Sequence, residues 1–161
     1  MVGPYKLAGY DVRGFDLPND VRLLRYERLR VHGILAAPPC TVFSYARNRY
    51  EPTEDELRAA LSVVDACLRA VVIYRPVWWA LENPMNKLRR YLGPPAWKFR
   101  QWEYGDAGEK PTGLWGRFTP PMYTVGRRTK PSTWQTKLEN ASPRDAITPP
   151  NFARAFFEAN P

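Results

Sequence analysis

The chain has 161 residues, a formal net charge of +8 and a sequence pI near 9.7. This length suffices for one domain with its own core, so we expect residues 1–161 to form a single domain. No stretch approaches the roughly eighteen apolar residues of a membrane span, and the N-terminus lacks a signal-peptide centre, which predicts a soluble, cytoplasmic protein without a membrane partner. Two cysteines and one histidine are too few for a disulfide framework or a four-ligand zinc site, so we expect no metal.

The positive charge predicts a polyanionic partner, with nucleic acid first. Much of it is clustered rather than spread evenly. A solvated surface explains such clusters about as well as phosphate contact does, so charge alone does not decide between them. The clustered residues are Arg22, Arg25, Arg28 and Arg30, and again Arg127, Arg128 and Lys130.

Apolar and polar side chains alternate through residues 10–16, which predicts a strand ending at Asp16. In nucleotide-binding α/β folds, an acid at the end of the second strand accepts hydrogen bonds from ribose hydroxyls. Asp16 is therefore a candidate cofactor ligand, and a surface-turn aspartate is the alternative.

A second apolar run, Gly33 to Ala37, is too short for a stable helix and predicts a buried strand. Pro38 and Pro39 cannot continue the strand because proline has no N–H. Cys40 is thereby placed at the carboxyl end of the strand, where open α/β sheets bind ligands, and is a candidate nucleophile. The alternative is a small buried hydrophobic residue.

Thr53 and Glu56 form a capping box, and apolar residues then recur at helical spacing to about Tyr74. A buried strand, Val77 to Leu81, follows and places Glu82 at the same sheet edge as Cys40. Because one helix joins the two strands, we expect them to be parallel neighbours. Cys67, on the helix, is expected to be core.

The last third of the chain predicts two short strands, a long loop and a terminal helix. In order, these are the strands Phe99 to Tyr104 and Gly113 to Phe118, the loop over residues 119–148, and the helix Asn151 to Glu158.

Two sequence blocks resemble motifs of the DNA cytosine 5-methyltransferases. Ala37-Pro38-Pro39-Cys40-Thr41-Val42-Phe43-Ser44 resembles their catalytic Pro-Cys loop, and Trp79-Ala80-Leu81-Glu82-Asn83-Pro84 resembles their Glu-Asn motif, in the expected order. Two further stretches, Tyr91 to Pro95 and Leu114 to Gly116, are similar to short, phage-type members. The likeness covers roughly residues 9 to 160.

The resemblance implies a Rossmann-like, three-layer α/β domain, truncated at the N-terminus and without a separate target-recognition domain. It implies methylation of cytosine at ring position 5, in DNA or a free nucleotide, with S-adenosylmethionine as methyl donor. Cys40 would add to ring position 6 and Glu82 would hydrogen-bond or protonate ring nitrogen 3. The implied cofactor-binding residues are Asp16, Asp20 and Pro38. The implied substrate-binding residues are Pro39, Ser44, Arg47, Asn83, Pro84 and Lys110.

The sequence departs from the family in two places. The opening strand and Gly-rich turn are absent from residues 1–161, so the chain is either a shortened member or begins upstream of Met1, and we expect weak cofactor binding by these residues. Pro111 stands where relatives often have arginine. A sheet without its first strand is expected to pair the strand containing Val12 directly with Gly33 to Ala37, or to be completed by a homodimer or partner chain.

Two other functions therefore stay open: a catalytically inactive, methyltransferase-like DNA-binding protein, and a different cysteine enzyme such as a hydrolase. The second would need a partner base, and His32, the single histidine, lies at the opposite end of its strand from Cys40.

Overall fold

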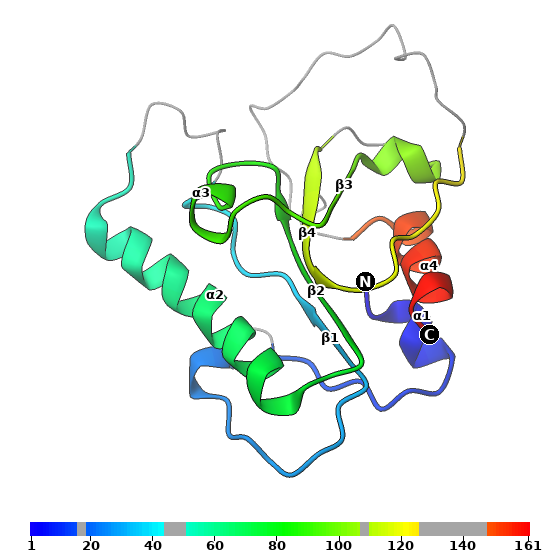
Figure 1. The fold of residues 1–161 in the computed structure, drawn as a ribbon, viewed down its shortest axis with the longest axis horizontal. Helices are drawn as coiled ribbons and strands as arrows, with labels where there is room; N and C mark the ends of the chain where they lie inside the picture. Colours follow the sequence, from blue (N-terminus) through cyan, green and yellow to red (C-terminus); the bar gives the residue numbers. More distant parts are fainter. Residues whose placement is uncertain (16–18, 44–50, 107–109, 126–147) are drawn as a thin grey trace, which may run out of the picture. The chain divides into compact units, whose positions relative to one another are not determined.

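The computed structural model describes residues 1–15, 19–43, 51–106, 110–125 and 148–161, and it shows a mixed α/β fold with a four-stranded mixed sheet (Figure 1). The elements are α1 (Gly3–Leu7), the 3₁₀ turn η1 (Val21–Leu23), β1 (Gly33–Ala36), α2 (Glu54–Tyr74), β2 (Trp78–Pro84), α3 (Arg89–Leu92), β3 (Trp97–Phe99), the 3₁₀ turn η3 (Gln101–Tyr104), β4 (Thr112–Arg117) and α4 (Pro150–Ala159).

Residue contacts divide the chain into two compact units. Unit 1 comprises Met1–Asp11, Phe99–Pro111 and Thr119–Pro161, and unit 2 comprises Val12–Lys98 and Thr112–Phe118. That residues 1–161 act as a single domain stays a prediction.

The strand order in the sheet is β1-β2-β4-β3 (Figure 1). β1 and β2 are parallel, in a register that runs from Gly33 beside Trp78 to Ala36 beside Leu81. This confirms the predicted parallel pair. β4 is antiparallel to β2. Among the described residues β1 is an edge strand, and the expected pairing of β1 with a strand containing Val12 is wrong.

Helix α2 begins where the sequence predicts. The Thr53 hydroxyl accepts a hydrogen bond from Glu56 N at 3.2 Å, and the Glu56 carboxylate accepts one from Thr53 N at 2.9 Å, so two N-terminal donors of the helix are satisfied. The helix ends at Arg75, which adopts the left-handed conformation with φ 48°, directly before Pro76.

The core of unit 2 lies between α2 and the sheet. Val64 of α2 is buried with residues of two neighbouring strands, Leu81 of β2 and Trp115 of β4. The Trp115 indole also donates to Gly93 O at 2.9 Å. None of the helices in the described ranges combines the length and the apolar composition needed to cross a membrane.

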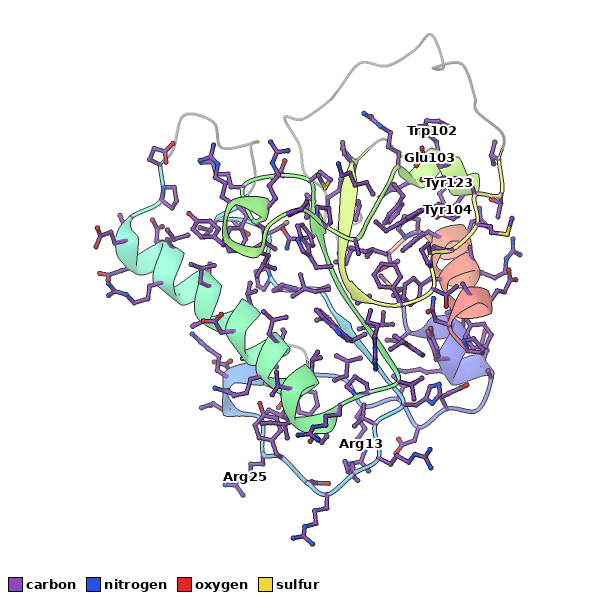
Figure 2. All side chains as sticks on the ribbon, viewed as in Figure 1. Arg13, Arg25, Trp102, Glu103, Tyr104 and Tyr123 are labelled. Atoms are coloured by element: carbon purple, nitrogen blue, oxygen red, sulfur yellow. The ribbon has the colours of Figure 1, made fainter. Side chains whose placement is uncertain are left out.

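Unit 1 is built around the buried face of α4. The rings of Phe152 and Phe99 stack at 3.8 Å, and the Tyr104 ring lies edge-on to Phe152 at 5.0 Å. The Tyr123 ring lies 5.6 Å from Tyr104, and both residues are labelled in Figure 2. The Asp106 carboxylate accepts hydrogen bonds from the first-turn amides of α4, which is the favourable place for a negative charge on a helix.

Two predicted strands are corrected by the structure. Residues 10–15 form no strand: Tyr10 N instead donates to Tyr5 O at 3.1 Å, continuing the turn that closes α1. In the segment 99–104 only Phe99 belongs to a strand, because the Glu103 carboxylate accepts a 2.6 Å hydrogen bond from Arg100 N and starts the turn η3. Left-handed Gly105 ends that turn.

The predicted strand Gly113 to Phe118 matches β4, and the terminal helix matches α4. β4 passes very close to β2 at Gly116, which has φ 144°, and a Cβ there would collide with the Trp79 carbonyl. Only glycine satisfies both constraints.

Candidate active site

The two sequence blocks meet where β1 and β2 end. Because the strands are parallel and Ala36 lies beside Leu81, the residues that follow Ala36 run alongside Glu82 and Asn83. β2 is longer than predicted, since it continues through Glu82 and Asn83 to Pro84. These motif residues therefore have their backbones fixed by pairing with β4.

Asn83 connects the two blocks directly. Its side-chain Nδ2 donates a hydrogen bond to Pro38 O at 3.0 Å, two residues before Cys40. Asn83 is 1% exposed. Its Oδ1 is also buried and has no hydrogen-bond partner among the described residues. The amide thus fixes the start of the cysteine loop and retains one unused acceptor.

The loop is held a second time after Cys40. Phe43 N donates to Cys40 O at 3.0 Å, which closes a turn, and Phe43 O accepts from Lys87 N at 2.9 Å. The Phe43 side chain is buried in the core of unit 2, with its ring 6.1 Å from that of Tyr91. Cys40 therefore lies in a short segment attached to the sheet end on both sides.

The two cysteines have different surroundings. Cys40 is half-buried in the loop, whereas Cys67 lies on α2 and packs against the core of unit 2. Burial raises the pKa of the Cys67 thiol because the thiolate loses its hydration. The prediction that Cys67 is a core residue is confirmed.

Glu82 and Asn83 point to opposite faces of β2, because side chains alternate along a strand. Asn83 shares its face with Leu81, which packs beneath α2, and Glu82 lies on the other face and is half-buried. The roles of Cys40 and Glu82 as nucleophile and ring-nitrogen partner stay predictions.

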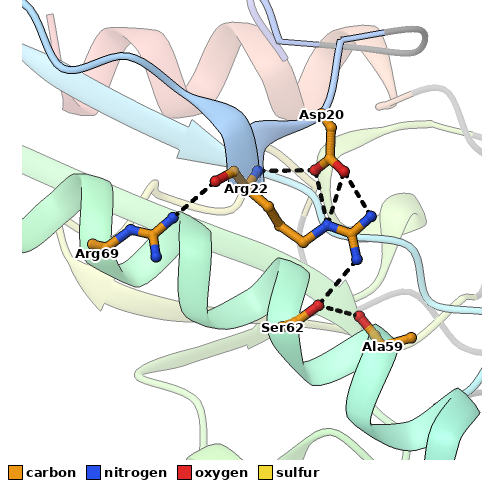
Figure 3. A network of polar contacts seen from close by, with 5 residues as sticks. All are labelled: Asp20, Arg22, Ala59, Ser62 and Arg69. Carbon is orange, nitrogen blue, oxygen red and sulfur yellow. Dashed lines mark hydrogen bonds and ion pairs between the residues drawn. The ribbon is translucent and has the colours of Figure 1, made fainter.

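Three residues were predicted to bind the cofactor, and the structure describes two of them, Asp20 and Pro38. Asp16 lies outside the described residues. Asp20 is bound by Arg22, which donates to its carboxylate through the backbone N and the guanidinium in four hydrogen bonds of 2.6–3.0 Å (Figure 3). These contacts come from three N–H groups of Arg22 and take up most of the acceptor capacity of the carboxylate, so a ribose hydroxyl would have to compete with Arg22 for it. Pro38 is buried at the sheet end.

The Asp20–Arg22 pair has a structural role. Arg22 also donates to Ser62 Oγ at 3.2 Å, and its own carbonyl accepts from Arg69 at 3.2 Å, which attaches η1 to the outer side of α2 (Figure 3). These hydrogen bonds lower the pKa of Asp20 and raise that of Arg22.

The substrate-binding predictions are placed as follows. Pro39 is exposed on the loop and Pro84 is buried in β2. Ser44 and Arg47 lie outside the described residues. Lys110 belongs to unit 1, whereas the cysteine loop belongs to unit 2. Their contacts with a substrate stay predictions.

Two residues, Phe43 and Lys87, anchor the cysteine loop in a way that was not predicted. Lys87 does so through its backbone N, and its side chain is 12% exposed and lies 3.8 Å from the Glu51 carboxylate. A signal for Phe43 was available, because an apolar aromatic three residues after a loop cysteine can return to the core and anchor the loop.

The described residues contain no group of three histidine, cysteine or acidic side chains arranged to hold a metal ion. Comparisons with protein-family models, with curated proteins and with solved structures gave no match for this chain.

Proposed function

We propose that this chain is a cytosine 5-methyltransferase that acts on DNA through a covalent adduct of Cys40. One observation carries the proposal: Asn83, in the Glu-Asn-Pro block, donates a hydrogen bond to Pro38, in the Pro-Pro-Cys block. Two blocks that the resemblance treats as one catalytic unit are thus in direct contact, at the carboxyl end of parallel strands, where α/β folds bind ligands.

The chemistry assigned to the chain's own residues is an addition to the cytosine ring. The Cys40 thiolate forms a bond to C6, the electrons of the C5–C6 double bond move toward N3, and Glu82 supplies the proton that N3 takes up. C5 is then enamine-like and can bond to an electrophile. Loss of the original C5 hydrogen as a proton to water and expulsion of the thiolate then restore the C5–C6 double bond, and N3 returns its proton to Glu82, which restores the aromatic ring.

The methyl donor that the resemblance implies is S-adenosylmethionine, and the described residues do not make a site for it. Asp20 is occupied by Arg22, and no strand forms over residues 10–15 to present an acid. We therefore assign no residue of the described chain to the donor and derive no step through it.

The addition can be tested without the methyl donor. In water the enamine takes up a proton at C5, so duplex DNA with deuterium at cytosine C5 should lose the label, as measured by mass spectrometry. Wild-type protein and Cys67→Ser should promote the exchange, and Cys40→Ser should not.

Retention of the label with wild-type protein, or its loss with Cys40→Ser, would show that Cys40 is not the nucleophile. The same assay on free deoxycytidine separates a nucleotide substrate from DNA. Addition of S-adenosylmethionine should then yield 5-methylcytosine if the chain completes the reaction, and no product at any donor concentration contradicts the transferase activity.

A further inference from the structure

The end of the β1–β2 pair opposite to Cys40 carries a group of arginines that the proposed chemistry does not use. We call it the amino-edge surface. All five side chains are exposed and come from three separate segments. They are Arg25, Arg28 and Arg30 before β1, Arg75 between α2 and β2, and Arg117 at the end of β4.

Backbone hydrogen bonds bring these segments together. His32 O accepts from Val77 N at 2.9 Å, which places the residues before β1 beside those before β2. Arg117 Nη2 donates to Pro76 O at 2.8 Å and to Val77 O at 3.0 Å. Arg117, Arg75 and the segment leading to His32 therefore meet at one end of the sheet.

Aromatic contacts hold the loop that carries Arg25 and Arg28 against the end of α2. Tyr26 lies with its ring 5.6 Å from that of Tyr74, and Tyr74 OH accepts from Glu27 N at 3.4 Å. Arg25 directly precedes Tyr26, and Arg75 directly follows Tyr74. The two arginines are therefore next in sequence to the two members of the Tyr26–Tyr74 pair. Figure 2 shows Arg25 projecting outward from the loop.

The charge of this surface is not neutralised locally. None of the five arginines forms an ion pair with a carboxylate in the part of the chain that the structure describes. The acids nearest in sequence are already engaged: Glu27 pairs with Arg13 at 3.2 Å, and Asp20 pairs with Arg22. Within the described residues, the five guanidinium groups therefore have no paired carboxylate.

We infer that the amino-edge surface binds the phosphate backbone of duplex nucleic acid, at a site separate from the Cys40 edge. All five cations are arginine, whose planar fork matches two phosphate oxygens at once. The seven residues of β2 separate the two edges by roughly 20 Å. The inference does not depend on the chemistry at Cys40, because no residue is shared.

A nucleic acid fits this surface better than an anionic membrane does. Membrane-surface binding typically uses one helix with an apolar face and a basic face. Here the arginines come from loops and strand ends of three separate segments and not from one amphipathic helix. The exposed Leu29 and Val77 provide apolar surface for the sugars.

The test measures binding of a fluorescent duplex made only of A·T pairs, which contains no cytosine. The variant Arg25→Gln/Arg28→Gln/Arg30→Gln removes three charges from the surface. The control Lys6→Gln/Arg58→Gln/Arg154→Gln removes three exposed charges elsewhere. We expect the first to weaken binding about tenfold or more and to reduce the slope of log K against log salt by about 2 to 3, with little effect of the control.

Equal losses in the two triple variants would overturn the inference, because they would mean that net charge alone drives binding. Unchanged DNA binding, with loss of binding to vesicles that contain anionic phospholipid, would overturn it in favour of a membrane surface. Cys40→Ser should bind the A·T duplex like wild type, so this result is independent of the exchange assay. Unchanged thermal midpoints of both triple variants exclude loss of the fold as the cause.

Discussion

Unit 1 and unit 2 each contain a fully buried asparagine, and the two side chains are satisfied to different degrees. In unit 1, Asn160 is 3% exposed: its Oδ1 accepts from Thr119 N at 2.7 Å, and its Nδ2 donates to Thr119 O and Phe156 O. In unit 2, Asn83 is 1% exposed, and only its Nδ2 has a partner among the described residues.

The difference distinguishes a structural amide from a candidate functional one. A buried polar network with every group paired stabilises a unique packing, whereas an unpaired buried acceptor costs free energy and calls for an explanation. The unpaired Oδ1 belongs to the same buried side chain whose Nδ2 holds the start of the cysteine loop, so we assign Asn83 to positioning of that loop. Each of the following changes tests one side of this contrast.

Asn160→Ala should give the largest effect. It removes three side-chain hydrogen bonds made by a buried residue, each worth about 1 kcal/mol, for an expected loss of about 3 kcal/mol in the free energy of unfolding. Urea unfolding, followed by fluorescence, measures it. The control is Asn151→Ala, in which a half-buried amide is lost but its backbone contact with Asp106 remains. A loss as small as the control's would show that the Asn160 network is not structural.

Asn83→Ala should affect activity more than stability. One hydrogen bond to Pro38 is lost, but an unpaired acceptor is removed with it, so the cost is about 1 kcal/mol. The cysteine loop loses its fixed start, and a shift of about 1 Å can cost on the order of 100-fold in rate. The C5 exchange assay measures the rate. A fall in stability as large as that of Asn160→Ala, with exchange preserved, contradicts the functional assignment.

The two thiols provide a third, smaller contrast, within unit 2. Cys67 has its pKa raised by burial, so its reactive thiolate is scarce near neutral pH, whereas Cys40 lies in a loop. We expect Cys40 to react with iodoacetamide about tenfold faster than Cys67. Peptide mass spectrometry over time distinguishes the two sites. Equal reaction rates of the two thiols in the folded protein would contradict this prediction and indicate that α2 opens readily. A rate difference that persists in urea would not indicate such opening.

The smallest effect is expected at the exposed pair Asp20–Arg22. Hydrogen bonds from Arg22 lower the pKa of Asp20, so the folded state binds its proton less readily than the unfolded state does. The stabilisation is present above the ordinary carboxyl pKa of about 4 and is lost as pH falls through the lowered value. Asp20→Asn should lower the thermal midpoint slightly near neutral pH, with a difference from wild type that narrows in acid. A constant difference at all pH values would contradict this linkage.

The sequence allowed prediction of the elements that rest on local signals. The capping box of Thr53 and Glu56 determines where α2 starts, and Pro76 determines where it cannot continue. The parallel pairing of β1 and β2 followed because a single long helix joins two short apolar runs.

Elements that depend on a competing local contact were missed. The alternation through residues 10–15 resembles a strand, but Tyr10 is held by α1 through its backbone and by Tyr5 and Phe157 through its ring. At residues 101–104 the signals for a turn, Glu103 and Gly105, were present but were outweighed by aromatic residues that favour strands.

The sequence allowed prediction of the sheet edge at which the candidate site lies, but not of the contacts within it. The sequence indicated that Cys40 and Glu82 follow neighbouring strands, but the hydrogen bond between Asn83 and Pro38 depends on the register of the two strands. The grouping of Arg75 and Arg117 with Arg25, Arg28 and Arg30 depends on topology, which brings together residues up to about ninety positions apart in the sequence.

The three-part construction of unit 1 has a consequence for its synthesis on the ribosome. The Tyr5 hydroxyl donates to Asn160 O at 2.8 Å. Tyr5 is made early in synthesis, and this hydrogen bond can form only after Asn160 has been added. The stretches that form unit 2 are complete once Phe118 has been added. Unit 2 can therefore fold while α1 and the aromatic segment around Phe99 still expose the apolar surface that α4 will cover. We therefore expect the nascent chain to expose this apolar surface to chaperones until α4 has been made.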